Sequence, residues 1–334
     1  MKMIAVRILV VVVIIAGLAI GYFYTQFTPV KQSEWGVTFS HRHAEYMGFE
    51  WKTMFIDIVN DLKPKNMRLM AYWEDLEKEK GKFDFQIVDE MLIEAEKQGI
   101  DAILVVGHKQ PRWPECHHPA WYNDLPKEEQ DAALLNLVEQ SVEHYKSFGA
   151  IKAWQVENEP LFEFGPLCPK SDRNILAKEV ELVRKLDKRP IILTDSGELG
   201  RWLPTIKTGQ PDIFGSNMYR VVHNPKTGYF RYPLPPAFFK IKAGIAKTFT
   251  GMDNIVGIEL QAEPWFSQDL HLTDLKTQYG LMNPVIFEEY LTYAEDVGFR
   301  ENYLWGVEWW YWLAHNQGEW TMWERAKQLF VIGK

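Results

Sequence analysis

Two glutamates in the sequence stand where they could cleave a glycosidic bond. Glu159 lies in an Asn-Glu-Pro triplet that directly follows a β-rich apolar run, and Glu259 closes a second run of this kind. One carboxyl group can protonate the leaving oxygen while the other stabilises or attacks the anomeric carbon. Either glutamate could instead cap a turn, so this chemistry requires a fold that brings the two together.

Each of these glutamates has a neighbour that could take its place. Glu263 stands four residues after Glu259 and also resembles a loop carboxylate at a catalytic mouth. We favour Glu259 as the catalytic group because rigid strand ends position side chains better than loops, and we expect Glu263 to bind substrate. Glu157 and Glu159 should point to the same side by the period of two in a strand, but only Glu159 follows an asparagine.

The elements that must position these residues alternate along the chain between short β-rich runs and amphipathic stretches. The predicted strands are 35–39, 67–72, 101–107, 151–156, 190–194, 212–217, 254–259 and 302–307. The predicted helices include 51–62, 87–98, 127–148, 175–186, 283–297 and 319–329. Eight such units in about 300 residues predict an α/β fold, a (β/α)8 TIM barrel. A doubly wound open sheet is the alternative. The sequence does not support it, because no Gly-x-Gly-x-x-Gly motif follows the first predicted strand and no phosphate loop occurs.

In a TIM barrel, functional residues gather at the carboxyl ends of the strands, which is where both glutamates fall. With this placement, nearly everything from Trp35 onward resembles the retaining glycoside hydrolases of clan A, which include families 5, 35, 39 and 42. The resemblance implies that Glu159 is the acid/base, Glu259 the nucleophile, and Asn158 the residue that binds the sugar 2-hydroxyl. It also implies a double-displacement mechanism that needs no cofactor.

Further site residues follow from the same resemblance. Arg68 and the stretch 73–85 are similar to a pattern common in families 42 and 35, where the arginine would hold the nucleophile ionised. The alternative is an arginine that pairs with a structural carboxylate. Tyr219, after the sixth strand, is similar to the clan's tyrosine beside the nucleophile. Trp309 or Trp310, after the eighth strand, would lie under the sugar.

Several histidines also follow predicted strands. His41 and His108 stand where sugar hydroxyls would be held, although histidines satisfied at the barrel rim are an equal alternative. Together with His117 and His118 they could suggest a metal site. The cysteine spacing matches no zinc pattern, so we predict no metal.

The N-terminus carries an apolar run over residues 8–24, preceded by Lys2 and Arg7. Its length is near the lower limit for a membrane span and long for the core of a signal peptide. Basic residues before the run predict that the rest of the chain is exported. We therefore expect a transmembrane signal anchor over residues 1–26 and an extracytoplasmic catalytic domain over 27–334. A cleaved signal peptide, giving a secreted protein, is the alternative.

Export bears on the two cysteines, Cys116 and Cys168, which fall in the loops after the third and fourth strands. In an oxidising compartment, neighbouring loops on one face of a barrel favour a disulfide between them. Two free buried thiols are the alternative, because the sequence does not supply the Cβ geometry.

The amino-acid composition argues against some classes of binding partner. The chain has 334 residues, 46% hydrophobic and 25% charged, as in a globular protein. Its 37 Lys and Arg against 45 Asp and Glu argue against nucleic acid, and we expect no basic face toward anionic lipid. The 14 tryptophans suit a core, a sugar-stacking cleft, or both.

The expected substrate is therefore an oligo- or polysaccharide, whose sugar and linkage the sequence leaves open. A catalytically inactive carbohydrate-binding barrel and a transglycosylase that uses the same residues are the alternative functions.

Overall fold

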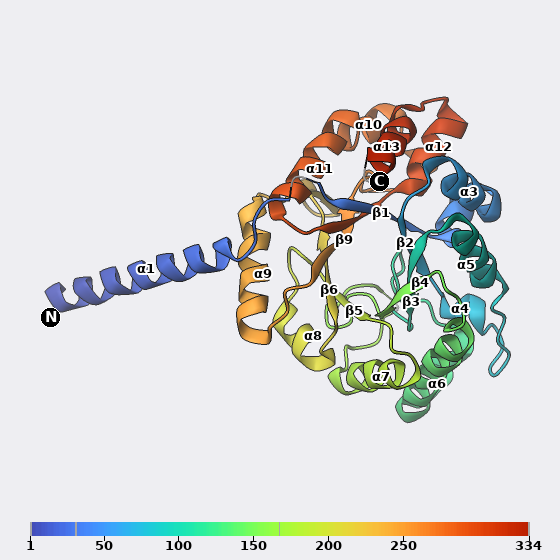
Figure 1. Cartoon of the computed structure of the whole chain (residues 1–334), viewed down its shortest axis with the longest axis horizontal. Coiled ribbons are helices and arrows are strands. Elements are labelled where there is room, and N and C mark those ends of the chain that lie inside the picture. The colour runs from blue at the N-terminus through green and yellow to red at the C-terminus, as the bar shows by residue number, and fades with distance from the viewer. Residues whose placement is uncertain (1, 31, 167, 333–334) are drawn as a thin grey trace.

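Eight parallel strands close into a barrel at the centre of the molecule, which Figure 1 shows in a view along the barrel. The computed structural model describes residues 2–30, 32–166 and 168–332. Neighbouring strands pair in the order β1-β10-β9-β6-β5-β4-β3-β2. The strands are β1 (Glu34–Phe39), β2 (Asn66–Met70), β3 (Asp101–Val106), β4 (Ile151–Val156), β5 (Ile191–Asp195), β6 (Ile213–Met218), β9 (Ile255–Gln261) and β10 (Glu301–Trp305). The predicted TIM barrel is confirmed.

Helices surround the barrel on the outside (Figure 1). The α-helices are α1 (Lys2–Thr25), α2 (His41–Tyr46), α3 (Trp51–Asp57), α4 (Trp73–Leu76), α5 (Gln86–Gln98), α6 (Lys127–Tyr145), α7 (Arg173–Leu186), α8 (Trp202–Gly209), α9 (Pro236–Thr250), α10 (Leu275–Leu281), α11 (Pro284–Val297), α12 (Val307–Gln317) and α13 (Thr321–Ile332). A π-helical segment, Ile58–Leu62, continues α3, and short 3-10 helices cover Ala120–Asp124 and Leu270–Leu272.

The predicted strand boundaries agree with the structure to within two residues, but two features differ. An antiparallel hairpin, β7 (Val221–Asn224) and β8 (Gly228–Arg231), follows β6 and was not predicted, because each strand has only four residues. The eighth predicted strand ends at Trp305, since Gly306 has a φ of 139° that breaks the extended backbone. Residues after it form α12 rather than the end of a strand.

The barrel interior is apolar toward the amino-terminal ends of the strands. A cluster of buried side chains fills this part: Ile103, Ala153, Ile192, Val256, Ile258 and Tyr303. Each buried isoleucine or valine of this cluster contributes about 1.5–3 kcal/mol of transfer free energy. Polar residues occupy the carboxyl ends of the strands, and this apolar cluster closes the barrel beneath them.

Helix α1 leaves the barrel sideways from α9, as Figure 1 shows. Within it, Ala5–Thr25 is long and apolar enough to cross a membrane, and a signal sequence would meet the same criteria. The end of α1 packs on α9, where Gly244 leaves room for the carbonyl of Phe23. The ammonium of Lys240 lies 5.0 Å from the centre of the Tyr24 ring. The apolar helix is thus continuous with the packing of the barrel wall.

Candidate active site

Polar side chains from several strand ends meet at the barrel mouth around Arg68. This fully buried arginine, on β2, donates from Nη1 to Glu259 Oε1 (2.7 Å) on β9. Its Nη2 donates to Asn158 Oδ1 (2.8 Å), and its Nε donates to Gln155 Oε1 (2.8 Å). A buried carboxylate needs a partner of opposite charge, and Arg68 supplies it for Glu259. One guanidinium therefore fixes the predicted nucleophile and the predicted sugar-binding amide relative to each other.

Glu159 lies in a different environment from Glu259. Its carboxyl group is buried, and its Oε1 accepts a hydrogen bond from the neutral amide of Asn217 (2.8 Å). Burial raises the pKa of Glu159 well above its ordinary value, and the negative charges of Glu259 and Glu115 add to the rise. A carboxyl group that keeps its proton near neutral pH can act as a general acid.

Glu157 and Glu159 do not share one side, contrary to the expectation from strand alternation. Both have left-handed backbone, with φ of 59° and 46°, so the period of two ends at Val156. Such residues cost about 1–3 kcal/mol each and collect at functional sites. The carboxylate of Glu157 accepts from the backbone N–H groups of His108 (2.9 Å) and Lys109 (2.6 Å). Glu157 is thus held by the loop after β3.

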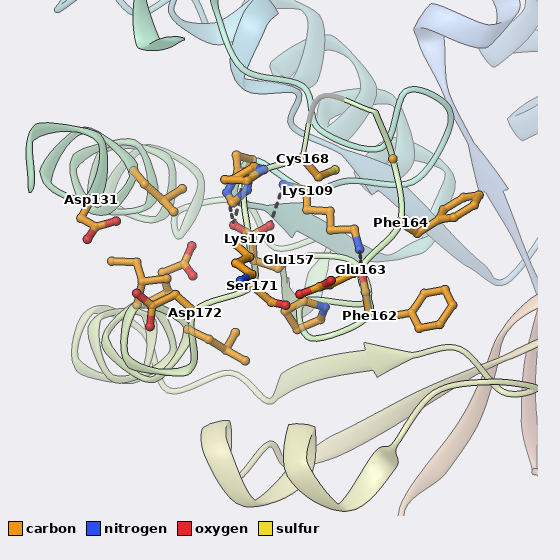
Figure 2. A pocket seen from close by; sticks show the side chains of 18 of the residues that line it. Lys109, Asp131, Glu157, Phe162, Glu163, Phe164, Cys168, Lys170, Ser171 and Asp172 are labelled. Atoms are coloured by element: carbon orange, nitrogen blue, oxygen red, sulfur yellow. Dashed lines mark hydrogen bonds and ion pairs between the residues drawn. The ribbon is translucent and has the colours of Figure 1, made fainter. Parts of the chain in front are cut away.

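Glu157 and His108 line a cavity of about 430 Å³ beside the mouth, between the loop after β4 and helices α6 and α7 (Figure 2). His108 Nδ1 lies 3.1 Å from Glu157 Oε1. Burial opposes ionisation of Glu157, but His108 and its backbone N–H outweigh it, so the pKa of Glu157 is lowered. Burial and the Glu157 charge raise the pKa of Glu179 on α7. The structure therefore groups His108 with Glu157 rather than with Glu159.

Tyr219, just after β6, lies beside Glu259 and donates from its hydroxyl to Oε2 (3.2 Å). The backbone N–H of Tyr219 donates to Glu198 Oε1 (2.6 Å), which fixes the start of the loop. Its ring meets that of Trp265 edge-on, with the centroids 5.4 Å apart. The two oxygens of Glu259 thus accept from a guanidinium and a phenol.

Glu263 forms an ion pair with Arg112, a residue of the loop after β3. The same guanidinium reaches Glu308 Oε2 on α12 (2.7 Å) and lies 4.1 Å from the centre of the Trp305 ring. All four side chains are buried. This arrangement commits Glu263 to holding loops together, whereas Glu259 lies next to the predicted sugar-binding amide.

Trp309 and Trp310 are not brought to the mouth. Both lie in α12 and are completely buried, and Trp310 Nε1 donates to the carbonyl of Ala262 (2.8 Å). The expected platform under the sugar is therefore not provided by either residue, because β10 ends earlier than predicted. Trp305 is the tryptophan at the actual strand end.

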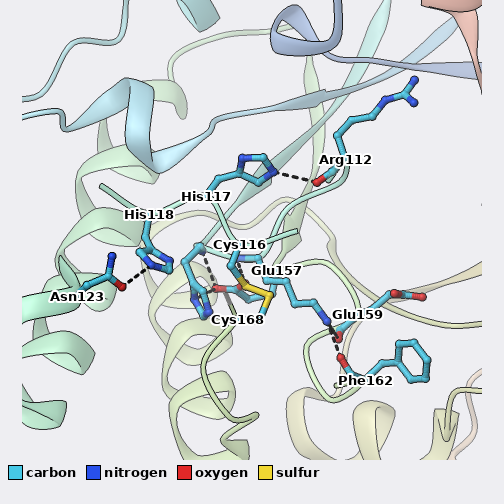
Figure 3. The surroundings of a disulfide bond; sticks show 11 residues. Arg112, Cys116, His117, His118, Asn123, Glu157, Glu159, Phe162 and Cys168 are labelled. Atoms are coloured by element: carbon cyan, nitrogen blue, oxygen red, sulfur yellow. Dashed lines mark hydrogen bonds and ion pairs between the residues drawn. A yellow bond between two sulfur atoms is a disulfide. The ribbon is translucent and has the colours of Figure 1, made fainter. Parts of the chain in front are cut away.

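A disulfide joins Cys116 and Cys168, with Cα atoms 5.1 Å apart, as predicted (Figure 3). It links the loop after β3 to the loop after β4, which begins beside Glu159. Among the residues that the structure describes, no group of three or more potential metal ligands occurs. His41 instead pairs with Asp75, with Nε2 2.8 Å from the carboxylate.

Three polar residues of the mouth were not predicted from the sequence: Gln155, Asn217 and Glu115. Asn217 stands two residues before Tyr219, so the strand period could have identified it. Burial and the charge of Glu259 raise the pKa of Glu115 to about 8. Its Oε2 has no hydrogen-bond partner among the described residues. No local pattern marks Glu115, because its position depends on a loop with left-handed backbone (φ 75°).

Comparison with known proteins adds to this geometry. The model of glycosyl hydrolase family 10 matches residues 31–176, which include Arg68, Asn158 and Glu159. No curated protein matches the chain.

Solved structures share the barrel. A GH5_18 protein from Bifidobacterium longum subsp. longum is 12% identical, with a TM-score of 0.62 over 90% of this chain and 79% of that chain. Xylanase 10B from Thermotoga petrophila, in complex with xylobiose, is 15% identical, with a TM-score of 0.54 over 82% of both chains. A psychrophilic family 10 endo-beta-1,4-xylanase is 16% identical, with a TM-score of 0.50 over 85% and 87%. At these identities the structures establish the fold alone.

Proposed function

We propose that this chain is a (β/α)8 glycoside hydrolase of clan A and cleaves β-glycosidic bonds by double displacement with net retention. The observation that carries the proposal is the unequal environment of two carboxyl groups. Glu259 accepts from the guanidinium of Arg68, whereas the buried Glu159 accepts from the neutral amide of Asn217. The first environment favours a carboxylate nucleophile and the second a protonated acid.

In the first step, a carboxylate oxygen of Glu259 attacks the anomeric carbon while the bond to the leaving oxygen breaks. Glu159 gives its proton to that oxygen. In the second step, Glu159 takes a proton from water, whose oxygen attacks the anomeric carbon and breaks the ester to Glu259. The free enzyme is regenerated with Glu159 protonated.

The neighbours of these two groups have supporting roles. The Oδ1 of Asn158 accepts from Arg68 (2.8 Å) and from Thr194 (3.2 Å). Its Nδ2, which also hydrogen-bonds Glu115, is therefore the group that donates to the sugar 2-hydroxyl. Tyr219 donates to the oxygen of Glu259 that Arg68 does not contact. The hydrogen bonds from Arg68 and Tyr219 together hold the carboxylate of Glu259 in one orientation. Attack in line with the leaving group requires such an orientation.

The test is azide rescue with the full chain in detergent. Aryl β-xylosides come first in the panel because of the family 10 match, followed by glucosides, galactosides, mannosides and oligosaccharides. Glu259→Ala should lose activity and recover it with azide, giving an α-glycosyl azide. Glu263→Ala is the matched control, because it removes a carboxylate four residues away. Rescue in Glu263→Ala alone would refute the assignment, and sugar binding without turnover in wild type would indicate a binding barrel.

We also propose that residues 1–26 stay attached as a membrane anchor, with the catalytic domain of residues 27–334 outside the cytoplasm. The packing of Phe23 on Gly244 supports this, since cleavage would remove part of the barrel's own packing. The intact mass of the protein from the membrane fraction tests the proposal. A mass lacking the anchor would indicate a secreted enzyme.

A further inference from the structure

The charge of the barrel is strongly uneven, although the chain as a whole is acidic. Residues 199–252 contain eight Lys and Arg against a single Asp, in a chain whose net charge is −8. This segment forms α8, β6, the β7–β8 hairpin and α9. Residues 74–101, which form α4 and α5, contain ten Asp and Glu against four Lys. The two segments lie on opposite sides of the barrel (Figure 1).

Most of the cations in the basic segment point outward. Three of the eight are used internally. Lys240 lies over Tyr24, Lys242 donates to the carbonyl of Gly197 (2.6 Å), and Arg220 donates to the carbonyl of Leu234 (2.8 Å). Five others are exposed or half-exposed, and we call them the basic face: Arg201, Lys207, Lys226, Arg231 and Lys247. Of these, Lys247 has a carboxylate nearby, with its Nζ 4.0 Å from Asp253 Oδ2. The net charge alone leads us to expect no basic face toward anionic lipid.

Helix α9, which carries Lys247 of the basic face, adjoins the place where α1 leaves the barrel. The end of α1 contacts α9, where the rings of Phe23 and the exposed Phe249 lie 6.3 Å apart. Aromatic residues at the end of a membrane span lie at headgroup depth. Tyr22, Phe23 and Tyr24 therefore place α9 next to the lipid headgroups when α1 spans a bilayer.

We propose that the basic face docks onto the anionic phospholipid headgroups of the membrane that α1 spans. Each Lys or Arg near an anionic surface favours the docked state about fivefold, which corresponds to about 1 kcal/mol. The attraction acts within a Debye length of about 8–10 Å, so high salt should abolish it. Docking fixes the orientation of the barrel, which a single helix would leave free to swivel.

The test uses the full chain in lipid nanodiscs and a membrane-impermeant reagent that acylates lysines. Lys207 and Lys247 should react at least about fivefold more slowly in discs rich in phosphatidylglycerol than in discs of phosphatidylcholine alone. Lys80 and Lys82, exposed on the acidic side, are matched controls whose rates should not change. High salt should remove the difference.

Equal rates for Lys207 in both kinds of disc would overturn the proposal, as would failure of the chain to enter discs. Lys207→Glu combined with Lys247→Glu should abolish the protection of Lys226, whereas Lys80→Glu with Lys82→Glu should not. Unchanged hydrolysis of an aryl glycoside shows that both variants fold. Protection of the same lysines by a soluble anionic polysaccharide, but not by phosphatidylglycerol, would also overturn the proposal and assign the face to substrate.

Discussion

Arg112→Met removes the cation that two buried carboxylates share at the barrel mouth. Arg112 bridges Glu263, after β9, and Glu308, on α12, while Glu308 Oε1 also accepts from the backbone N–H of Ser40 (2.6 Å). The guanidinium therefore ties the loop after β3 to the loop after β9 and to α12, and Glu308 extends the link to Ser40 after β1. Methionine has a similar length and is apolar, so it fills much of the space but supplies no charge and no donor.

The expected loss follows from burial. Leaving a buried ion pair broken costs about 3–5 kcal/mol, and losing the contact of the guanidinium with Trp305 costs about 0.5–2 kcal/mol. A loss of about 4–6 kcal/mol is a large part of the 5–15 kcal/mol that is typical of a folded domain. At about 2–4 °C per kcal/mol, the melting temperature should fall by roughly 10–20 °C.

The loss should depend on pH in a definite direction. Burial raises the pKa of Glu308, the charge of Glu263 adds to the rise, and Arg112 opposes it. Without Arg112 the pKa of Glu308 rises further, so the folded variant binds a proton that the unfolded chain has released. A group with a raised pKa contributes stability that is lost as pH rises through the folded-state value. The destabilisation should be smallest near pH 5 and largest near pH 8, changing by up to about 1.4 kcal/mol per pH unit.

Urea unfolding of the full chain in detergent, followed by tryptophan fluorescence, measures this loss at each pH. Arg112→Met combined with Glu308→Gln should be more stable than Arg112→Met alone above neutral pH. The double variant has only the carboxylate of Glu263 at this place, whereas the single variant has the carboxylates of both Glu263 and Glu308. The reasoning is refuted if the loss is the same at acidic and alkaline pH, or if Glu308→Gln restores nothing.

Four further predictions concern the mouth. Glu159→Gln should slow hydrolysis about 10²–10⁴-fold for poor leaving groups and remove the alkaline limb of the pH–rate profile, which kinetics with a series of aryl glycosides would show. Tyr219→Phe removes a donor to a carboxylate worth about 1.5–3 kcal/mol, so the melting temperature should fall by several degrees, and kcat/KM should fall roughly 10- to 100-fold because the nucleophile loses its fixed orientation. Opening the disulfide with Cys116→Ser and Cys168→Ser should cost about 4 kcal/mol for a sequence separation of 52, and the urea midpoint of wild type alone should respond to reductant. Burial raises the pKa of Glu115 from 4.5 to about 8, so wild type loses stability as pH rises through that range; Glu115→Gln should match wild type at acidic pH and exceed it at alkaline pH in urea unfolding.

The barrel could be predicted because each strand is a short apolar run between helices, a signal that depends only on neighbouring residues. The same local signal fails at Trp309 and Trp310. A run of aromatic residues is compatible with the end of a strand and equally with a buried helix. The left-handed backbone of Gly306 ends the strand there, so the run forms a helix. The four-residue strands of the β7–β8 hairpin are too short to show a period.

The candidate site divides in the same way. Arg68 lies within the predicted second strand and Tyr219 follows the sixth, so both positions could be counted from the sequence. Glu157 could not, because left-handed backbone replaces the alternation on which the prediction depended. The ion pair of Arg112 with Glu263 joins residues 151 positions apart, so it exists only once the barrel has closed.

The sideways departure of α1 has a consequence for how substrate arrives. Figure 1 looks along the barrel while α1 runs across the view, so the barrel axis lies nearly parallel to any bilayer that α1 spans. The mouth then opens along the membrane surface instead of away from it. A glycan chain that lies parallel to the membrane surface can then enter the mouth without bending. A chain that projects perpendicular to the membrane runs across the mouth and has to bend to enter it. With α1 across a bilayer, the direction of a polymer would therefore affect whether it reaches the mouth.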